Sequence, residues 1–275
     1  MRINKILNNN AVVVKESGHE KIVMGNGIAF QKKKNDIITK TKIEKIFVMK
    51  EGNQKFQDLL TTLPEEHIEI AEEVISYAEG QLQVPLNDHI HIALSDHISF
   101  AIERFRQGYP IQNKLLNEIK TLYKEEFSIG VWARNLINER LELDMPIDEA
   151  GHIALHIHTA KIHTKNMHHA LEQTTMINEV IQLIERKLNQ KLDEEGISYQ
   201  RLVTHIRFAL NRIETKQPFH TMDAEMLAMI EEKYQQAYTI AAQVSAYLKD
   251  EYQVKFPVSE IGYISLHIQR LMEKV

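Results

Sequence analysis

The periodicity of hydrophobic and polar residues changes near Pro64, and this change divides the chain into two parts. Before Pro64, short β-branched segments predict a small antiparallel sheet with strands at residues 3–7, 11–15, 21–24 and 42–48. Residues that favour turns separate these segments, namely Asn8-Asn9-Asn10, Ser17-Gly18, Gly25-Asn26-Gly27 and Asn35-Asp36. A core of about 50 residues is marginal alone, so we expect one face of the sheet to pack against a second copy.

After Pro64, apolar residues recur every three or four positions, which is typical of amphipathic helices. The first apolar stripe begins at Ile68, and Gly80 is expected to end that helix. Polar residues from His163 to His169 interrupt the pattern and indicate a linker. Helices are predicted at residues 65–80, 89–105, 111–124, 129–142, 147–162, 173–190, 199–214, 222–250 and 258–273, the last preceded by Pro257 and N-capped by Ser259.

An internal repeat relates the two halves of the helical part. HISFAIER at 97–104 matches HIRFALNR at 205–212 in five of eight positions, and EAGHIALHI at 149–157 matches EIGYISLHI at 260–268 in six of nine. The offsets are 108 and 111 residues, so the order and spacing of the motifs are kept. The sequence therefore predicts a multidomain protein, with a small antiparallel β-sheet domain at 1–55 followed by two all-α helical-bundle domains at 65–165 and 172–275.

The composition limits the class of protein. The chain contains no cysteine, which excludes disulfides, thiolate metal sites and cysteine nucleophiles. No apolar run approaches the roughly 20 residues that a membrane helix needs, and the N-terminal residues lack the apolar centre of a secretory signal. We therefore expect a cytoplasmic protein without membrane insertion.

Charge is distributed unevenly along the chain. Residues 1–50 contain eleven Lys and Arg residues against four Asp and Glu residues, a balance of +7. Because the whole chain carries −5, the remaining residues carry −12. An ordinary solvated surface can give such a balance, but a basic module attached to an acidic body also indicates that the first part binds a polyanion.

The turns of the basic module carry side chains suited to RNA. Loop asparagines can hydrogen-bond to base edges, Phe30 can stack on a base, and Lys32-Lys33-Lys34 can neutralise phosphates. Structural explanations remain open for the same residues. Asparagines favour turns, Gly25 and Gly27 can supply positive φ, and Phe30 can belong to the core.

Two histidines are retained in each copy of the repeat, namely His97 and His156, then His205 and His267. A neutral imidazole is a good nucleophile toward phosphorus and can accept a phosphoryl group reversibly. The product could pair with Arg104 or Arg212, each seven residues after the first histidine on about the same helix face. Any single histidine is more simply a core-edge residue, but four at repeated positions favour phosphate acceptance.

A metal site is an alternative role for these histidines. His152 and His156 have the spacing of a zinc-binding helix face, but no glutamate of the H-E-x-x-H pattern accompanies them, and Tyr263 replaces His152 in the second copy. The Asp-His order at 88–89 and 96–97 is the reverse of that in helical metal-dependent phosphohydrolases. We expect no metal, no cofactor and no catalytic residues, and hence a protein that is not an enzyme.

The motifs resemble a known family along the whole chain. KILNNNAVVV, MGNGIAFQKKKND and KIEKIF resemble the co-antiterminator RNA-binding module of the BglG/SacY transcriptional antiterminators. LSDHISFAIER with DEAGHIALHI, and LVTHIRFALNR with SEIGYISLHI, resemble the two phosphotransferase-system (PTS) regulation domains of that family. Within it, TLPEEHIEIAEEVISYAEGQL is most similar to the antiterminators of sucrose operons.

The resemblance implies a homodimer that binds an RNA hairpin in the mRNA leader and prevents formation of an overlapping terminator. It implies control by histidine phosphorylation, with the phosphocarrier HPr and a PTS sugar permease (enzyme II) as partners. Asn26 stands where some members carry arginine, so a charge-assisted contact there is not carried over. The implied RNA-binding residues are Lys5, Asn8, Asn10, Gly25, Asn26 and Phe30, and the implied phosphoacceptors are His97, His156, His205 and His267.

A PTS-regulated DNA-binding transcription regulator is the alternative, because the same helical domains occur in such activators. No helix-turn-helix pattern precedes the repeats, and the basic module has the pattern of strands. RNA is therefore the favoured nucleic acid.

Overall fold

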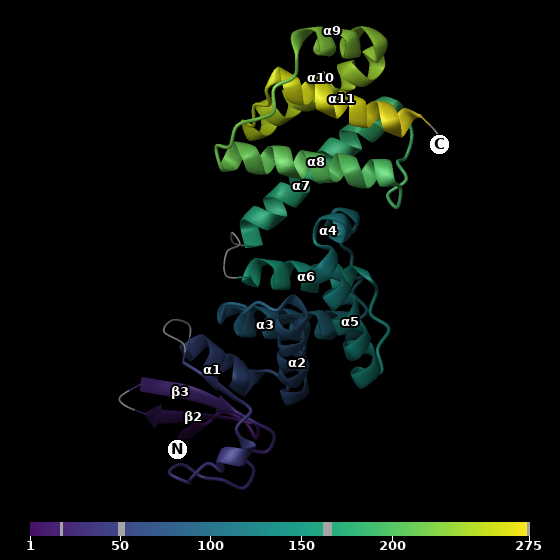
Figure 1. Ribbon diagram of the computed structural model, residues 1–275. Coiled ribbons are helices and arrows are strands. Elements are labelled where there is room, and N and C mark those ends of the chain that lie inside the picture. The colour runs from purple at the N-terminus through teal and green to yellow at the C-terminus, as the bar shows by residue number, and fades with distance from the viewer. Residues whose placement is uncertain (17–18, 49–52, 162–166, 274–275) are drawn as a thin grey trace. The chain divides into compact units, whose positions relative to one another are not determined.

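The computed structural model describes residues 1–16, 19–48, 53–161 and 167–273 (Figure 1). Its N-terminal part is an antiparallel sheet of four strands in the order β1-β2-β3-β4, which confirms the expected fold class. The expected turn at Ser17-Gly18 lies outside the described residues. The strands are β1 (Ile3–Ile6), β2 (Ala11–Glu16), β3 (His19–Met24) and β4 (Lys45–Phe47), the last preceded by a 3₁₀ turn (Lys40–Lys42).

Both faces of the sheet are covered within one chain, so the expectation that one face needs a second copy is wrong for this structure. Ile28, Ala29 and Ile38 pack with Val12, Val14 and Val23 on one face. A helix absent from the sequence prediction, α1 (Asn53–Thr62), covers the other face. Phe56, Leu59, Leu60 and Leu63 have the i, i+3, i+4, i+7 spacing of an amphipathic helix, a signal that the sequence prediction missed. On this second face α1 contributes Phe56 and Leu60 to a core that also contains Leu7, Ala11, Val13, Ile22, Met24, Phe47 and Ile68.

Within the described residues, the helical part contains five helices in each copy of the repeat. The first copy contains α2 (Glu65–Leu82), α3 (His89–Arg106), α4 (Leu116–Leu122), α5 (Lys124–Leu141) and α6 (Asp148–Ala160). The second contains α7 (Met167–Leu188), α8 (Ile197–Glu214), α9 (Ala224–Lys233), α10 (Gln235–Tyr252) and α11 (Val258–Met272). The first set precedes the second along the chain, and residues 162–166, which lie between the two sets, are outside the described residues.

Several helix boundaries differ from the sequence prediction. The helix predicted at 222–250 is two helices, because Tyr234 leaves the helical conformation (φ −122°, ψ 46°) while the apolar period continues across it. Gly80 does not end α2, which continues to Leu82 and stops at Gln83 in the left-handed region (φ 52°). The N-cap position of α11 is Pro257, not Ser259. Residues 163–169 were expected to form a linker, but helix α7 begins at Met167 and includes the last three of them. Residues 163–166 lie outside the described residues.

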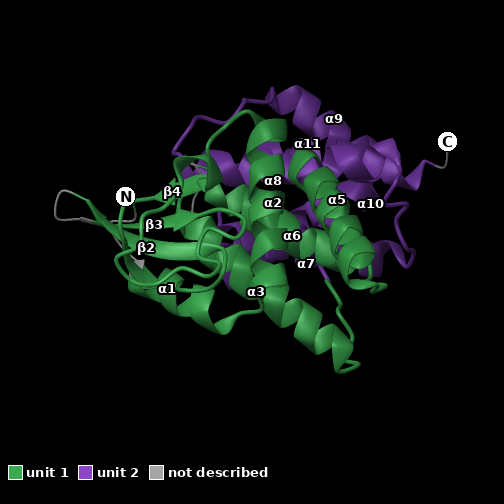
Figure 2. Ribbon diagram, turned by 90° about the horizontal axis from the view of Figure 1, so that it is seen from below, with its two compact units in different colours: residues 1–113, 125–164 green, residues 114–124, 165–275 purple. Residues whose placement is uncertain are grey.

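The chain forms two compact units, shown in green and purple in Figure 2. The first unit contains residues 1–113 and 125–164, and the second contains residues 114–124 and 165–275. Helix α4 therefore belongs to the second unit, where it packs on α7 and α8, although its sequence lies inside the first repeat. Its counterpart α9 instead packs on α10 and α11 of its own repeat.

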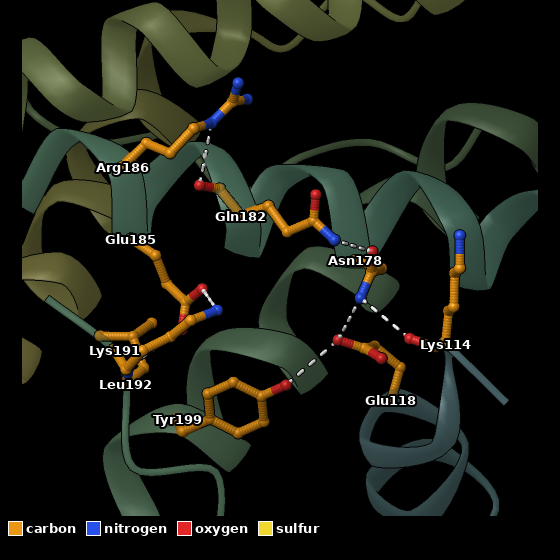
Figure 3. A network of polar contacts seen from close by, with 9 residues as sticks. All are labelled: Lys114, Glu118, Asn178, Gln182, Glu185, Arg186, Lys191, Leu192 and Tyr199. Carbon is orange, nitrogen blue, oxygen red and sulfur yellow. Dashed lines mark hydrogen bonds and ion pairs between the residues drawn. The ribbon is translucent and has the colours of Figure 1, made fainter. Parts of the chain in front are cut away.

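A buried carboxylate holds α4 in the second unit (Figure 3). Glu118 is 2% exposed and accepts hydrogen bonds from the Tyr199 hydroxyl (3.2 Å) and from Asn178 Nδ2 (3.2 Å). Burial raises the pKa of Glu118 despite these donors. Such an enclosed polar group needs its partners, so Tyr199 and Asn178 specify where α4 docks.

Candidate functional site

The turn β1–β2 and the loop after β3 form one continuous surface. The Asn10 side-chain oxygen accepts from the Gly27 amide at 2.6 Å, and the Gly25 amide donates to the Asn10 carbonyl at 3.0 Å. The Asn8 side chain accepts from the Asn10 amide at 2.8 Å and so shapes the first turn. Of the predicted RNA-binding residues, Asn8, Asn10, Gly25 and Asn26 are thereby brought together in adjacent turns.

Gly25 is required by a close approach of two chain segments. A Cβ added at this position would lie 1.7 Å from the Lys42 carbonyl oxygen, closer than any two non-bonded atoms can come. Gly27 has φ +58°, in the left-handed region that favours glycine. The glycines therefore shape the loop, whose backbone amides at Gly25, Asn26 and Gly27 are already used in hydrogen bonds within the chain.

Phe30 follows the glycine loop and is 61% exposed, which excludes it from the core. Lys5 and Asn26 are also exposed. Exposed large aromatic side chains beside a loop rich in asparagine and lysine are typical of surfaces that stack on single-stranded bases.

Helices α1 and α2 already engage the polar side chains of the first turn. Asn8 Nδ2 donates to the Leu60 carbonyl at 3.0 Å, and Asn10 Nδ2 donates to Glu69 Oε1 at 2.5 Å. Asn9 and Lys5 make longer contacts with Glu65 and Gln57, respectively. A ligand that accepts hydrogen bonds from these side chains must replace their hydrogen bonds to α1 and α2.

A second polar contact joins the sheet to the helices. Glu72 accepts from Lys45 Nζ on β4 (2.9 Å) and from His91 Nδ1 on α3 (2.6 Å). The His91 ring also packs edge-on against Phe47, with ring centroids 4.6 Å apart. Two cationic or donor partners on one carboxylate lower the pKa of Glu72 although it is buried. Helix α3, which carries His97, is therefore anchored directly to the sheet.

The repeated histidines form two pairs with nearly the same geometry. His97 on α3 and His156 on α6 have ring centroids 4.6 Å apart and ring planes inclined by 39°. His205 on α8 and His267 on α11 have corresponding values of 4.9 Å and 38°. The sequence repeat thus produces the same arrangement of two imidazoles on adjacent helices in each copy.

A buried glutamate contacts the first histidine of each pair. His97 Nε2 lies 2.7 Å from Glu149 Oε1, and His205 Nε2 lies 2.9 Å from Glu260 Oε2. Both glutamate side chains are 1% exposed, whereas the two histidines are about one-fifth exposed, at 21% and 22%. Each site therefore combines an accessible imidazole with an enclosed carboxylate. Sequence reasoning did not predict these glutamates, although both are the first residue of the repeated motif, EAGHIALHI or EIGYISLHI, which is the signal that identifies them.

The second histidine of each pair is held neutral. Burial, with the neighbouring His97, lowers the pKa of His156 to about 3. Burial, with the neighbouring His205, lowers that of His267 to about 4. The Nδ1 atom of His267 is buried with no hydrogen-bond partner in the described part of the chain. A neutral imidazole with an unused ring nitrogen keeps its nucleophilic lone pair.

The two arginines that are predicted to pair with a phosphorylated histidine have other neighbours in the chain without phosphate, so that pairing stays a prediction. Arg104 lies over the Phe100 ring, 5.5 Å from its centroid, and Arg212 lies 3.0 Å from His220 Nε2. His152 lies near His97, with ring centroids 5.8 Å apart. Among the described residues, no group of three or more His, Asp or Glu side chains is placed to hold a metal ion. None of the described helices is long and apolar enough to cross a membrane.

Comparison with known proteins defines the class. Residues 1–56 match the CAT RNA binding domain, and residues 72–160 and 178–271 match the PRD domain. The chain thus joins an RNA-binding module to two PRD domains, and its first 56 residues contain all six predicted RNA-binding positions.

Relatives match over the full length. The chain is 39% identical over 277 residues to the transcription antiterminator LicT of Bacillus subtilis (100% of both chains) and 35% identical over 278 residues to the beta-glucoside operon antiterminator of Dickeya chrysanthemi (100% of this chain, 98% of the relative). The crystal structure of GlcT CAT-PRDI has 38% identity and a TM-score of 0.55, and the match covers 58% of this chain and 98% of that one. The chain belongs to the BglG/SacY family of transcription antiterminators.

Proposed function

We propose that this protein binds an RNA hairpin in the leader of a nascent mRNA and prevents terminator formation for a sugar-utilisation operon. The single observation that carries the proposal is the joined surface of the β1–β2 turn and the glycine loop, within a match to an RNA-binding domain. A homodimer in the cytoplasm would double the basic surface and present two such loops. The resemblance to sucrose-operon antiterminators makes sucrose the proposed sugar, and a relative is named for a beta-glucoside operon.

The RNA contacts have distinct roles in this proposal. The side chains of Asn8, Asn10 and Asn26 hydrogen-bond to base edges, Phe30 stacks on an unpaired base, and Lys5 contacts phosphate. Gly25 acts indirectly, because its missing side chain lets the Lys42 carbonyl pack against the loop and so fixes the shape of the RNA surface. Phe30 is well suited because its ring is exposed while the backbone beside it is fixed by the Phe30 amide donating to the Gly27 carbonyl.

The histidine pairs serve as phosphoacceptors. HPr donates a phosphoryl group to His205 or His267, and the sugar permease donates to His97 or His156. Support comes from the matching geometry of the two pairs and from the neutral state of the second histidines. A phosphoryl group adds about −1.5 to −2 charges, enough to change contacts at a domain or dimer interface.

Binding of an RNA hairpin by the purified full chain, measured at several salt concentrations, tests the RNA function. Affinity should fall with added salt, with a log–log slope of about −0.7 to −0.9 for each phosphate contact. Phe30→Ala should weaken binding and leave the unfolding temperature unchanged, because the ring is exposed. Binding that is absent, or that does not depend on salt, would rule the proposal out.

A further inference from the structure

We propose that Glu149 and Glu260 are positioning residues that hold His97 and His205 as the tautomer protonated on Nε2, so that Nδ1 accepts the phosphoryl group. The inference rests on the proposed phosphoacceptor function and assigns the reacting atom and the residue that selects it. Neither glutamate contacts the phosphoryl donor in this scheme, since both are 1% exposed.

The hydrogen-bond geometry determines the tautomer. An ionised carboxylate can only accept hydrogen bonds, so the ring nitrogen facing it must carry the proton. That nitrogen is Nε2 in both sites, at 2.7 Å from Glu149 and 2.9 Å from Glu260. A neutral imidazole has one ring proton, which leaves the lone pair on Nδ1. The nucleophilic atom is therefore Nδ1 in both sites.

Two features indicate that this orientation belongs to the site. It occurs independently in each copy of the repeat, although Tyr263 replaces His152 beside it. Histidine–glutamate contacts elsewhere in the helical part use either nitrogen, since His169 faces Glu214 with Nε2 at 2.7 Å whereas two other histidines use Nδ1. His91 uses Nδ1 toward Glu72, and His158 uses Nδ1 toward Glu126 at 2.9 Å.

The carboxylate also suits the transfer itself. The donor is a phosphohistidine of a partner protein. Its P–N bond breaks, and the electron pair returns to the donor ring, while the Nδ1 lone pair of His97 or His205 forms the new N–P bond. The proton on Nε2 stays in place, so the phosphorylated ring becomes cationic, and the enclosed carboxylate neutralises that charge. The arrangement parallels carboxylate-oriented histidines in which the second nitrogen reacts.

The tautomer can be measured before any phosphorylation. In the full chain with ¹⁵N-labelled histidine rings at neutral pH, NMR should show protonated Nε2 and unprotonated Nδ1 at His97 and His205. His158 serves as the internal control, since its Nδ1 should be the protonated nitrogen. Protonation on Nδ1 at His97 and His205 would overturn the inference whether or not these residues are phosphorylated.

The phosphorylated product provides the second test. After incubation of the full chain with HPr, enzyme I and phosphoenolpyruvate, ³¹P–¹⁵N correlation should place phosphorus on Nδ1 of His205. Glu260→Gln should slow transfer to His205 at least about tenfold, or give a mixture of Nδ1 and Nε2 products, because a glutamine can face the ring with either its oxygen or its NH₂ group. Glu214→Gln is the matched control, because Glu214 contacts the Nε2 atom of the remote His169 on the surface.

The outcomes separate this inference from the proposed function. Phosphate on Nε2 of His205 in the unsubstituted chain, or unchanged rate and product in Glu260→Gln, contradicts the inference and leaves phosphorylation intact. If no histidine accepts phosphate from any donor, the proposed control fails, and the tautomer measurement still decides whether the glutamates orient the rings. If circular dichroism shows that Glu260→Gln does not fold, the test is the ring nitrogen of His205 that carries phosphorus in the unsubstituted chain.

Discussion

At the scale of single residues, Gly25 shows how sterics at one atom can determine the shape of a binding loop. The Lys42 carbonyl occupies the place where any other residue would carry a Cβ atom. A side chain there forces the 40–42 turn away from the glycine loop. The geometry of the candidate RNA surface therefore depends on the absence of a side chain.

The first prediction is that Gly25→Ala destabilises the sheet domain by several kcal/mol, because overpacking against backbone cannot be relieved by a rotamer change. Thermal unfolding and RNA binding should both report the loss. Gly80→Ala is the matched control, since a Cβ at that helical position meets nothing within 4 Å. It should be neutral or stabilise α2 by up to about 1 kcal/mol. Equal stability of the two variants would contradict the assignment of Gly25.

The buried histidines lead to a second prediction, on pH. The folded chain depresses the pKa of His156 to about 3 and that of His267 to about 4, below the unfolded value of 6.5. The unfolded chain thus binds more protons in this range, and stability, full above pH 6.5, should be lost as pH falls toward 4. Each pKa unit corresponds to about 1.4 kcal/mol, so the decrease should amount to several kcal/mol.

Urea unfolding of the full chain between pH 7 and pH 4.5 measures this decrease. His156→Gln should show a smaller pH dependence than the unsubstituted chain, because it removes one of the titrating groups. Stability that increases on acidification over the same range would show that these histidines are not enclosed as the structure has them.

Residue identity allowed part of the site to be predicted from the sequence. The glycine and asparagine turns and the histidine pairs follow from composition, spacing and the repeat. The partners of the histidines do not. In the chain without phosphate, Arg104 lies over the Phe100 ring and Arg212 lies beside His220, so the predicted pairing of these arginines with a phosphorylated histidine stays a prediction. The enclosed glutamates are the first residues of a repeated motif, but only the packing of α6 on α3 and of α11 on α8 shows that they face the histidines.

At the scale of secondary structure, periodicity predicts helices well where an apolar stripe runs for several turns. It joins α9 to α10 because the stripe continues across Tyr234. Helix α1 was not predicted, although Phe56, Leu59, Leu60 and Leu63 have helical spacing. The docking of α4 on α7 and α8 follows from Glu118, Asn178 and Tyr199, which are far apart in sequence. Local pattern contains no information about such partners.

The contact between helix α2 and the β1–β2 turn leads to a third prediction, on the affinity for RNA. Glu69→Ala should increase the affinity of the full chain for an RNA hairpin by about twofold to tenfold, because a hydrogen bond of about 0.5–1.5 kcal/mol no longer holds the Asn10 amide. Glu66→Ala removes the same charge from the same helix without touching Asn10 and is the control for general electrostatics. An equal gain in both variants, or none in Glu69→Ala, would show that the Asn10–Glu69 contact does not compete with RNA.

At the scale of the whole molecule, a basic module of +7 precedes a regulatory part of −12, and the regulatory part carries the same histidine pair twice. Duplication permits two donors to act separately on one RNA-binding module. In the two-signal control that we propose from the family resemblance, phosphate on the first pair would disfavour the active dimer and phosphate on the second would favour it. A shift of about 1.4 kcal/mol changes such an equilibrium tenfold, which one or two charge-assisted hydrogen bonds can supply.

Expression of a reporter placed downstream of the terminator tests this account most directly. It is measured with the unsubstituted chain, His97→Ala and His205→Ala, each with and without the inducing sugar. We predict that His97→Ala gives read-through without sugar, because the permease can no longer inhibit, and that His205→Ala reduces read-through even with sugar, because HPr can no longer activate. A change in the same direction in both variants would contradict the two-signal control proposed for this chain.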